Sequence, residues 1–190
     1  MDALHAIRSR RSIRNYSKEP VTDAEVRAVL DAAMCAPSAF GQRSTRYVIV
    51  RDAETRARLA SASKHAAPVG RAPVAIVVCG DTSAERHPGT YFVHDAIAAL
   101  ENLLVAANAA GLGAVWIGVH PWEDRMTVVG EAVGLPPHVI PVATIALGHP
   151  EESKPAADRY AADFVHVERW DRTREGSGQI PERVSQDLGF

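Results

Sequence analysis

The chain has 190 residues, a formal net charge of −2 and 46% hydrophobic residues, which is enough apolar material for one packed domain. The near-neutral charge argues against a broad nucleic-acid-binding surface, since that usually shows as a strongly basic domain. The apolar runs are too short and too interrupted to span a bilayer, and the charged start MDALHAIRSRR has no signal-peptide hydrophobic segment, so we expect a cytoplasmic protein with no membrane or nucleic-acid partner.

Two helices are predicted before the first strand. Asp2 can cap a short helix that runs out into a group of arginines. Thr22 and Glu25 have the spacing of a capping box, and the apolar residues after them recur with helical period as far as Met34. Pro37 ends this second helix and begins the loop PSAFGQRST.

Alternating strands and helices follow that loop. RYVIV, at 46–50, reads as a strand, and a capped helix is expected to begin at Asp52. The continuous apolar run PVAIVVCG, at 73–80, is typical of a central strand buried on both faces.

The segment TYFVHDAIAALENLLVAANAAGLG, at 90–113, is apolar on nearly every side of a helical wheel, with Gly111 placed to end the helix. Such a helix must be covered all round, and one small protomer can hardly do that, so we expect a homodimer. Strands at 114–119 and 140–148 follow, with a helix containing MTVVGEAVG between them.

A polar tail begins at about Glu151. It carries more apolar groups than a solvated end would need, among them Tyr160, Phe164 and Trp170. We expect this segment to pack against other protein, and a partner subunit is one candidate.

No hydrolytic or metal chemistry is indicated by the sequence. The histidines lack metal-ligand spacing, no GxSxG turn occurs, and GLGAVWIG does not follow the GxGxxG order of a dinucleotide loop. Cys35 and Cys79 form no CxxC pair and are expected to be buried thiols. His94 and Asp95 are neighbours that point to different helix faces, and we interpret them as structural. A cofactor should then carry the chemistry.

The stretch IRSRRSIRNYSKEP, Ile7 to Pro20, concentrates positive charge in a nearly neutral chain. Four arginines and a lysine fall within twelve positions around Ser12. This cluster predicts a local anion site. The loop PSAFGQRST is a second candidate, because its small residues let backbone amides approach a flat ligand, although an ordinary surface loop is an equally good interpretation.

Four separated segments, taken together, carry a family resemblance: RRSIRNYSKEPV, APSA, D..AALENLLVAANAAGLGAVWIG and LGHPEESKP..DRY....VHVERW. In this order, over about residues 3 to 170, the chain resembles the FMN-dependent nitroreductase family. The resemblance implies an α+β fold with helices flanking a central mixed, mostly antiparallel sheet. It also implies an interlocked homodimer with FMN at the subunit interface. Residues 1–170 would form the FMN-binding domain, and 171–190 a tail that could wrap the partner.

The resemblance offers an anion for the basic cluster, the phosphate of FMN, which suits the planar fork of arginine. It implies that Arg10 and Ser12 bind the phosphate and ribityl end, while Arg11 contributes its backbone and charge. Lys154 and Arg159 fall in a second basic segment that would return to the same phosphate.

The resemblance also implies the contacts to the flavin ring. Arg14 corresponds to a basic residue near N1 and the C2 carbonyl, where negative charge collects on reduction. The loop that reaches the ring from the neighbouring subunit corresponds to Pro37, Ser38 and Ala39. The strand end that covers one face of the flavin corresponds to Trp116, Ile117 and Gly118, with the Gly118 amide placed to donate to N5.

The activity implied is that of an FMN-dependent NAD(P)H oxidoreductase working by ping-pong hydride transfer. NADH or NADPH would be the donor, and a nitroaromatic, a quinone or a similar small molecule the acceptor. FMN N5 would carry the chemistry, with no catalytic side chain and no metal. The chain departs from the family at Gly41 and Arg43, where a ring-edge contact is lost and a charge is gained. The alternatives are a flavin carrier or redox sensor without turnover, and another flavin reaction on the same scaffold.

Overall fold

The structure is a computed structural model that describes residues 1–157 and 159–170. The chain divides into two compact units. One runs from Arg10 to Lys154, and the other consists of Met1–Ser9 together with the chain from Pro155 onward. The predicted tail at 171–190 lies outside the described residues.

A four-stranded sheet forms the centre of the larger unit. Its strands are β1 (Thr45–Val50), β2 (Val74–Asp81), β3 (Gly113–Gly118) and β4 (Val139–Gly148). They lie in the order β1-β2-β4-β3, and each neighbouring pair is antiparallel. All four strands were predicted to within about a residue at each end. Within the described residues the only parallel pairing is an isolated bridge between Ser12 and Ala114 of β3, so the sheet is more uniformly antiparallel than expected.

The helices confirm the capping signals in the sequence. They are α1 (Ala3–Ser9), α2 (Asp23–Met34), α3 (Ala53–Ala60), α4 (Ala67–Arg71), α5 (Phe92–Ala109) and α6 (Glu123–Val133), with 3-10 turns η1 (Ala39–Gly41), η2 (Thr82–Ala84) and η3 (Ala162–Phe164). Thr22 and Glu25 make both halves of the predicted capping box, and Asp52 caps α3. Gly111, at φ +78°, ends α5.

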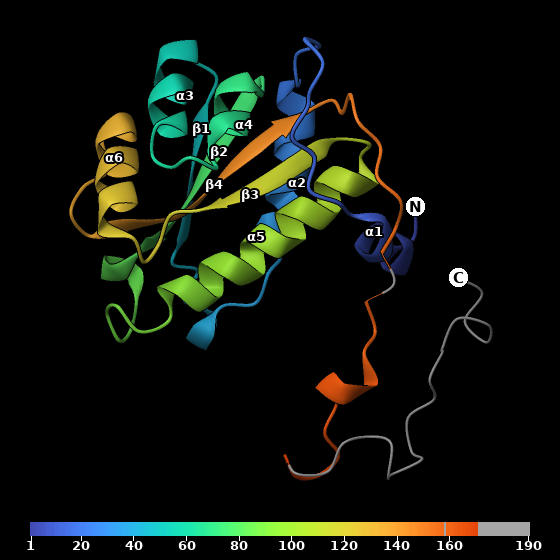
Figure 1. Cartoon of the computed structure of the whole chain (residues 1–190). Coiled ribbons are helices and arrows are strands. Elements are labelled where there is room, and N and C mark those ends of the chain that lie inside the picture. The colour runs from blue at the N-terminus through green and yellow to red at the C-terminus, as the bar shows by residue number, and fades with distance from the viewer. Residues whose placement is uncertain (158, 171–190) are drawn as a thin grey trace. The chain divides into compact units, whose positions relative to one another are not determined.

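Helices cover both faces of the sheet (Figure 1). Because side chains alternate along a strand, Val74, Ile76 and Val78 of β2 pack with α2 and α5 on one face. Their neighbours Ala75 and Val77 pack with α3, α4 and α6 on the other. The prediction of a central strand buried on both faces is therefore confirmed for β2.

Two helices leave apolar side chains exposed within one chain. Helix α5 buries one side against the sheet and α2, but it leaves Ile97 on the opposite side exposed. Met34 and Cys35, at the end of α2, are exposed as well, so the expectation that both cysteines are buried is wrong for Cys35. Ala33, one residue before Met34, is fully buried, so the last turn of α2 packs on the core through one side only.

Candidate functional site

The basic segment that follows α1 lies along the outer edge of β3. The Ile13 amide donates to the carbonyl of Ala114 over 3.0 Å, next to the parallel bridge made by Ser12. The Ile13 side chain is buried against Gly113, where a Cβ atom would lie 2.6 Å from Ile13 Cγ2. The segment can approach the strand this closely because position 113 has no side chain.

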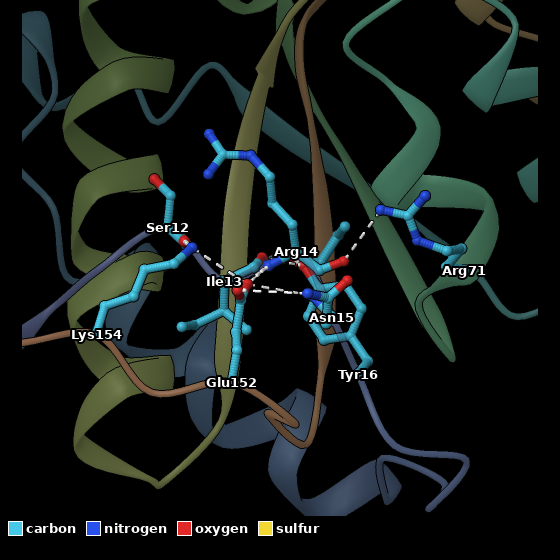
Figure 2. Close-up of polar contacts among 9 residues, drawn as sticks. Ser12, Ile13, Arg14, Asn15, Tyr16, Arg71, Glu152 and Lys154 are labelled. Atoms are coloured by element: carbon cyan, nitrogen blue, oxygen red, sulfur yellow. Dashed lines mark hydrogen bonds and ion pairs between the residues drawn. The ribbon is translucent and has the colours of Figure 1, made fainter.

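Glu152 and Lys154 tie the basic segment to a distant part of the chain (Figure 2). Glu152 Oε1 accepts hydrogen bonds from the amides of Arg14, at 2.5 Å, and Asn15, at 3.3 Å. Lys154 Nζ donates to the carbonyl of Ser12 over 2.6 Å and lies 3.2 Å from Glu152 Oε1. The bond from the Arg14 amide, helped by Lys154, holds the pKa of Glu152 below its usual value.

The Tyr16 hydroxyl also holds the basic segment in place. This hydroxyl donates to the carbonyl of Ile13 at 2.5 Å, and the carbonyl of Ala146, at 3.3 Å, is a second acceptor for the same proton. Burial, and then the charge of Glu152, raise the pKa of the Tyr16 hydroxyl, so it stays a neutral donor at physiological pH.

Arg71 is a cation of this region that the sequence did not single out. Its Nη2 donates to the carbonyl of Arg14 over 3.3 Å from the end of α4, while the Arg14 side chain extends away from Glu152 (Figure 2). A lone arginine between a helix and a strand carries no local signal, so only the fold places it here. Arg10 is mostly buried and pairs with Glu101 of α5, with 3.4 Å between Nε and Oε1, and Arg11 is half-buried.

The predicted flavin-covering residues continue along β3, beyond the strand position that meets Ser12. Trp116 is exposed, Ile117 is buried, and a side chain at Gly118 would meet open space. The Gly118 carbonyl accepts from Arg125 of α6 over 2.9 Å. The structure therefore brings Arg10, Arg11, Ser12, Arg14 and Lys154 to the edge of the strand that carries Trp116, Ile117 and Gly118.

The predicted ring-contact loop occupies a different place in the larger unit. The Ala39 amide donates to Asp95 Oδ1 over 2.9 Å, and Asp95 is only 5% exposed. Pro37 and Ser38 line a cavity of about 470 Å³, whose other lining residues are Leu30, Ala33, Met34, Ala36, Arg43, Thr45, Arg46, Tyr47, Ile49, Asp95 and Ala99. None of the predicted phosphate-binding residues lines this cavity. A contact of Pro37, Ser38 and Ala39 with a neighbouring subunit's ring stays a prediction.

Arg159, the remaining predicted phosphate ligand, lies in the smaller unit. That Arg159 and Arg10 bind the same phosphate also stays a prediction. Within residues 1–157 and 159–170, no three His, Cys, Asp or Glu side chains are grouped so as to hold a metal ion, and no helix has the length and apolar character needed to cross a membrane.

Residues 7–71 and 60–149 match the Nitroreductase family. The chain belongs to the nitroreductase family. This membership confirms the resemblance carried by the four segments, together with the α+β fold that it implied.

Three related proteins show how far the similarity to this nitroreductase-family chain extends. A protein of Methanothermobacter thermautotrophicus, provisionally named NADH dehydrogenase/NAD(P)H nitroreductase, is 43% identical over 90% of this chain and 88% of its own length. A structure from Desulfovibrio desulfuricans, of a provisionally named nitroreductase in complex with FMN, has a TM-score of 0.77 at 33% identity and covers 89% of this chain and 98% of its own. The structure of the NADPH:FMN oxidoreductase of Vibrio harveyi, solved with NAD⁺, has a TM-score of 0.77 at 28% identity, and the match covers 88% of this chain and 77% of its own.

Proposed function

We propose that this nitroreductase-family chain is an FMN-dependent NAD(P)H oxidoreductase. The names of its relatives support this activity, because they include an NAD(P)H nitroreductase, an FMN reductase and an NADPH-flavin oxidoreductase. The observation that carries the proposal is the group of cations fixed along the edge of β3. Guanidinium and ammonium donors around a serine suit a phosphate dianion, so the residues present fit FMN.

The phosphate end would be held by Arg10, Ser12 and Lys154, with Arg159 and the backbone of Arg11 as further ligands. Two of these side chains are already positioned, since Arg10 is paired with Glu101 and Lys154 is bonded to the Ser12 carbonyl. A preorganised cation loses less conformational entropy on binding than a solvated one.

The ring end would meet Arg14 and the strand end at Trp116, Ile117 and Gly118, with Pro37, Ser38 and Ala39 supplied by a neighbouring subunit. Glu152 and Arg71 fix the backbone of Arg14, and its exposed guanidinium would stabilise negative charge on the ring. When bound, FMN would supply the redox chemistry, namely hydride transfer from NADH or NADPH and electron transfer to a nitroaromatic, quinone or similar acceptor. The side chains of the protein then need only bind the cofactor, orient its ring and tune its reduction potential.

The visible absorption spectrum of the purified protein, followed anaerobically with NADH and then NADPH, tests this activity. Flavin bands that bleach with a nicotinamide and return on adding a quinone are expected. Bands that stay oxidised would favour a flavin carrier without turnover. A colourless protein that takes up no added FMN would overturn the cofactor assignment.

We also propose a homodimer. Strand β1 lies at one end of the sheet, and within the described residues no further strand pairs with its outer edge. Apolar side chains are exposed on both units, with Met34 at 58%, Phe164 at 81% and Trp170 at 83%. Burying such groups would favour association. Light scattering on the eluting protein should give twice the 20.4 kDa mass of one chain, and a monomer at micromolar concentration would contradict the proposal.

A further inference from the structure

An exposed group of aromatic rings next to the 37–39 loop has no role in the proposed function so far. Phe40 is 60% exposed, and its ring centroid lies 5.6 Å from that of His87 and 5.8 Å from that of Tyr91, both in edge-to-face geometry. Arg86 Cζ lies 5.5 Å from the centre of the Phe40 ring. We call Phe40, Arg86, His87 and Tyr91 the aromatic rim.

The backbone holds Phe40 outward in a conformation that an aromatic residue rarely adopts. Phe40 has φ +53°, and Arg43, three residues later, has φ +50°. Left-handed conformations at residues other than glycine persist only where the surroundings enforce them, and they concentrate at functional sites.

Two buried carboxylates enforce this loop conformation. Asp95 accepts from the Ala39 amide, and Glu85 accepts from the amides of Gly89, at 2.6 Å, and Tyr91, at 2.9 Å. Gln42 joins the two networks, with its Nε2 3.4 Å from Asp95 Oδ2 and 3.5 Å from Glu85 Oε1. The aromatic rim is therefore set in place before any ligand arrives.

The aromatic rim also carries positive charge that is free to pair. Gln42 Oε1 accepts from the Arg86 amide over 3.0 Å, which fixes the backbone that carries this arginine. In the part of the chain that the structure describes, neither Arg86 nor the nearby loop residue Arg43 forms a salt bridge. A cation–π contact uses no N–H donor, so the Arg86 guanidinium can still bind an anion through two parallel bonds.

We propose that the aromatic rim binds the electron acceptor, and that this acceptor is a planar aromatic molecule bearing a carboxylate or sulfonate. The inference rests on the proposed oxidoreductase function and narrows its substrate class. The ring of the ligand stacks on Phe40, and its anion pairs with Arg86. Since Phe40 directly follows Ala39, the rim adjoins the loop assigned to the cofactor.

Isothermal titration of the FMN-loaded protein with a redox-inert probe, 2-naphthoate, measures this binding apart from turnover. Naphthalene-2-carboxamide is the matched neutral probe. Arg86→Gln should weaken 2-naphthoate roughly tenfold, as for a lost charged hydrogen bond, and leave the carboxamide within about twofold. Phe40→Leu should weaken both probes, Phe40→Tyr should retain both, and Arg58→Gln, an exposed arginine on α3, should change neither.

Equal 2-naphthoate affinity in the wild type and Arg86→Gln would overturn the proposal, as would equal losses for the two probes. Unchanged melting temperatures establish that the variants fold. Anaerobic reduction of bound FMN by NADH or NADPH is measured on the same samples and should be unchanged in the control variant Arg58→Gln. If FMN in the wild-type protein is not reduced, the oxidoreductase proposal is overturned. The probe affinities would still test, independently, whether the aromatic rim binds an aromatic anion.

Discussion

Replacing Asp95 should destabilise the protein through the loop that it holds. Its carboxylate accepts from the Ala39 amide at 2.9 Å, the Ser44 hydroxyl at 3.2 Å and Gln42 Nε2 at 3.4 Å, and Ser44 is fully buried. Asp95→Ala removes the acceptor of two of these donors, the fully buried Ser44 hydroxyl and the half-buried Ala39 amide.

The size of the effect follows from those two donors. An unsatisfied buried donor costs roughly 1 to 3 kcal/mol, and the half-buried amide can regain water, so Asp95→Ala should lower the free energy of unfolding by about 1 to 3 kcal/mol, chiefly through the Ser44 hydroxyl. For a chain of this length that corresponds to a fall in melting temperature of at least about 2 °C. Asp95→Asn keeps an acceptor oxygen and should lose less than about 1.5 kcal/mol.

Thermal melts followed by circular dichroism at one fixed protein concentration measure the difference, since association would make the melting temperature concentration-dependent. Asp31→Ala is the control, because that aspartate makes an exposed pair with Arg27 one helical turn away and should cost at most about 0.5 kcal/mol. If Asp95→Ala has the same melting temperature as Asp31→Ala, or if Asp95→Asn lowers the melting temperature as much as Asp95→Ala, hydrogen bonding to Asp95 does not hold this loop.

Three other outcomes are expected. Arg10→Ala should weaken FMN binding by roughly 1.5 to 3 kcal/mol, measured by fluorescence titration, and unchanged affinity would remove Arg10 from the phosphate site. Gly113→Ala should lower the melting temperature, because the new methyl group would lie 2.6 Å from Ile13. Gly130→Ala should stabilise the protein by about 0.5 to 1 kcal/mol, because Gly130 lies within helix α6 and a methyl group there would meet no neighbouring atom. Thermal melts in which Gly113→Ala is the more stable variant would refute the close approach of Ile13 to Gly113. The pKa of Glu152 is lowered by its bond from a backbone amide, so the stability it contributes is present at neutral pH and lost as the pH falls through that lowered pKa. Melting temperatures of the wild type and Glu152→Gln should therefore differ at about pH 7 and converge towards about pH 3, and a constant difference would contradict this role.

Local signals in the sequence determined most of the elements. The Thr22 and Glu25 capping box, the Asp52 cap and the helix end at Gly111 depend on residues only a few positions apart, so they could be predicted without the fold. The apolar run of β2 likewise predicted a strand covered on both faces. Helix α4 was missed, because its five residues are too few for a helical period to show.

In the candidate site, too, the sequence predicted some features and only the fold revealed others. The family resemblance supplied the residues of the basic segment, of the 37–39 loop and of the end of β3. It did not supply what holds them, because Glu152 bonds to the Arg14 amide across 138 positions and Arg71 reaches the same residue across 57. Such partners are set by which elements lie side by side.

The sequence by itself thus determined the caps, the strands and the concentration of cations near Ser12, since each of these rests on short-range spacing or composition. Only the tertiary structure decided that β3 forms the edge along which that segment lies, and that Asp95 holds the loop carrying Phe40 outward. Sheet order and long-range hydrogen bonds are properties of the packed chain, in which a buried donor must find its acceptor wherever the fold provides one.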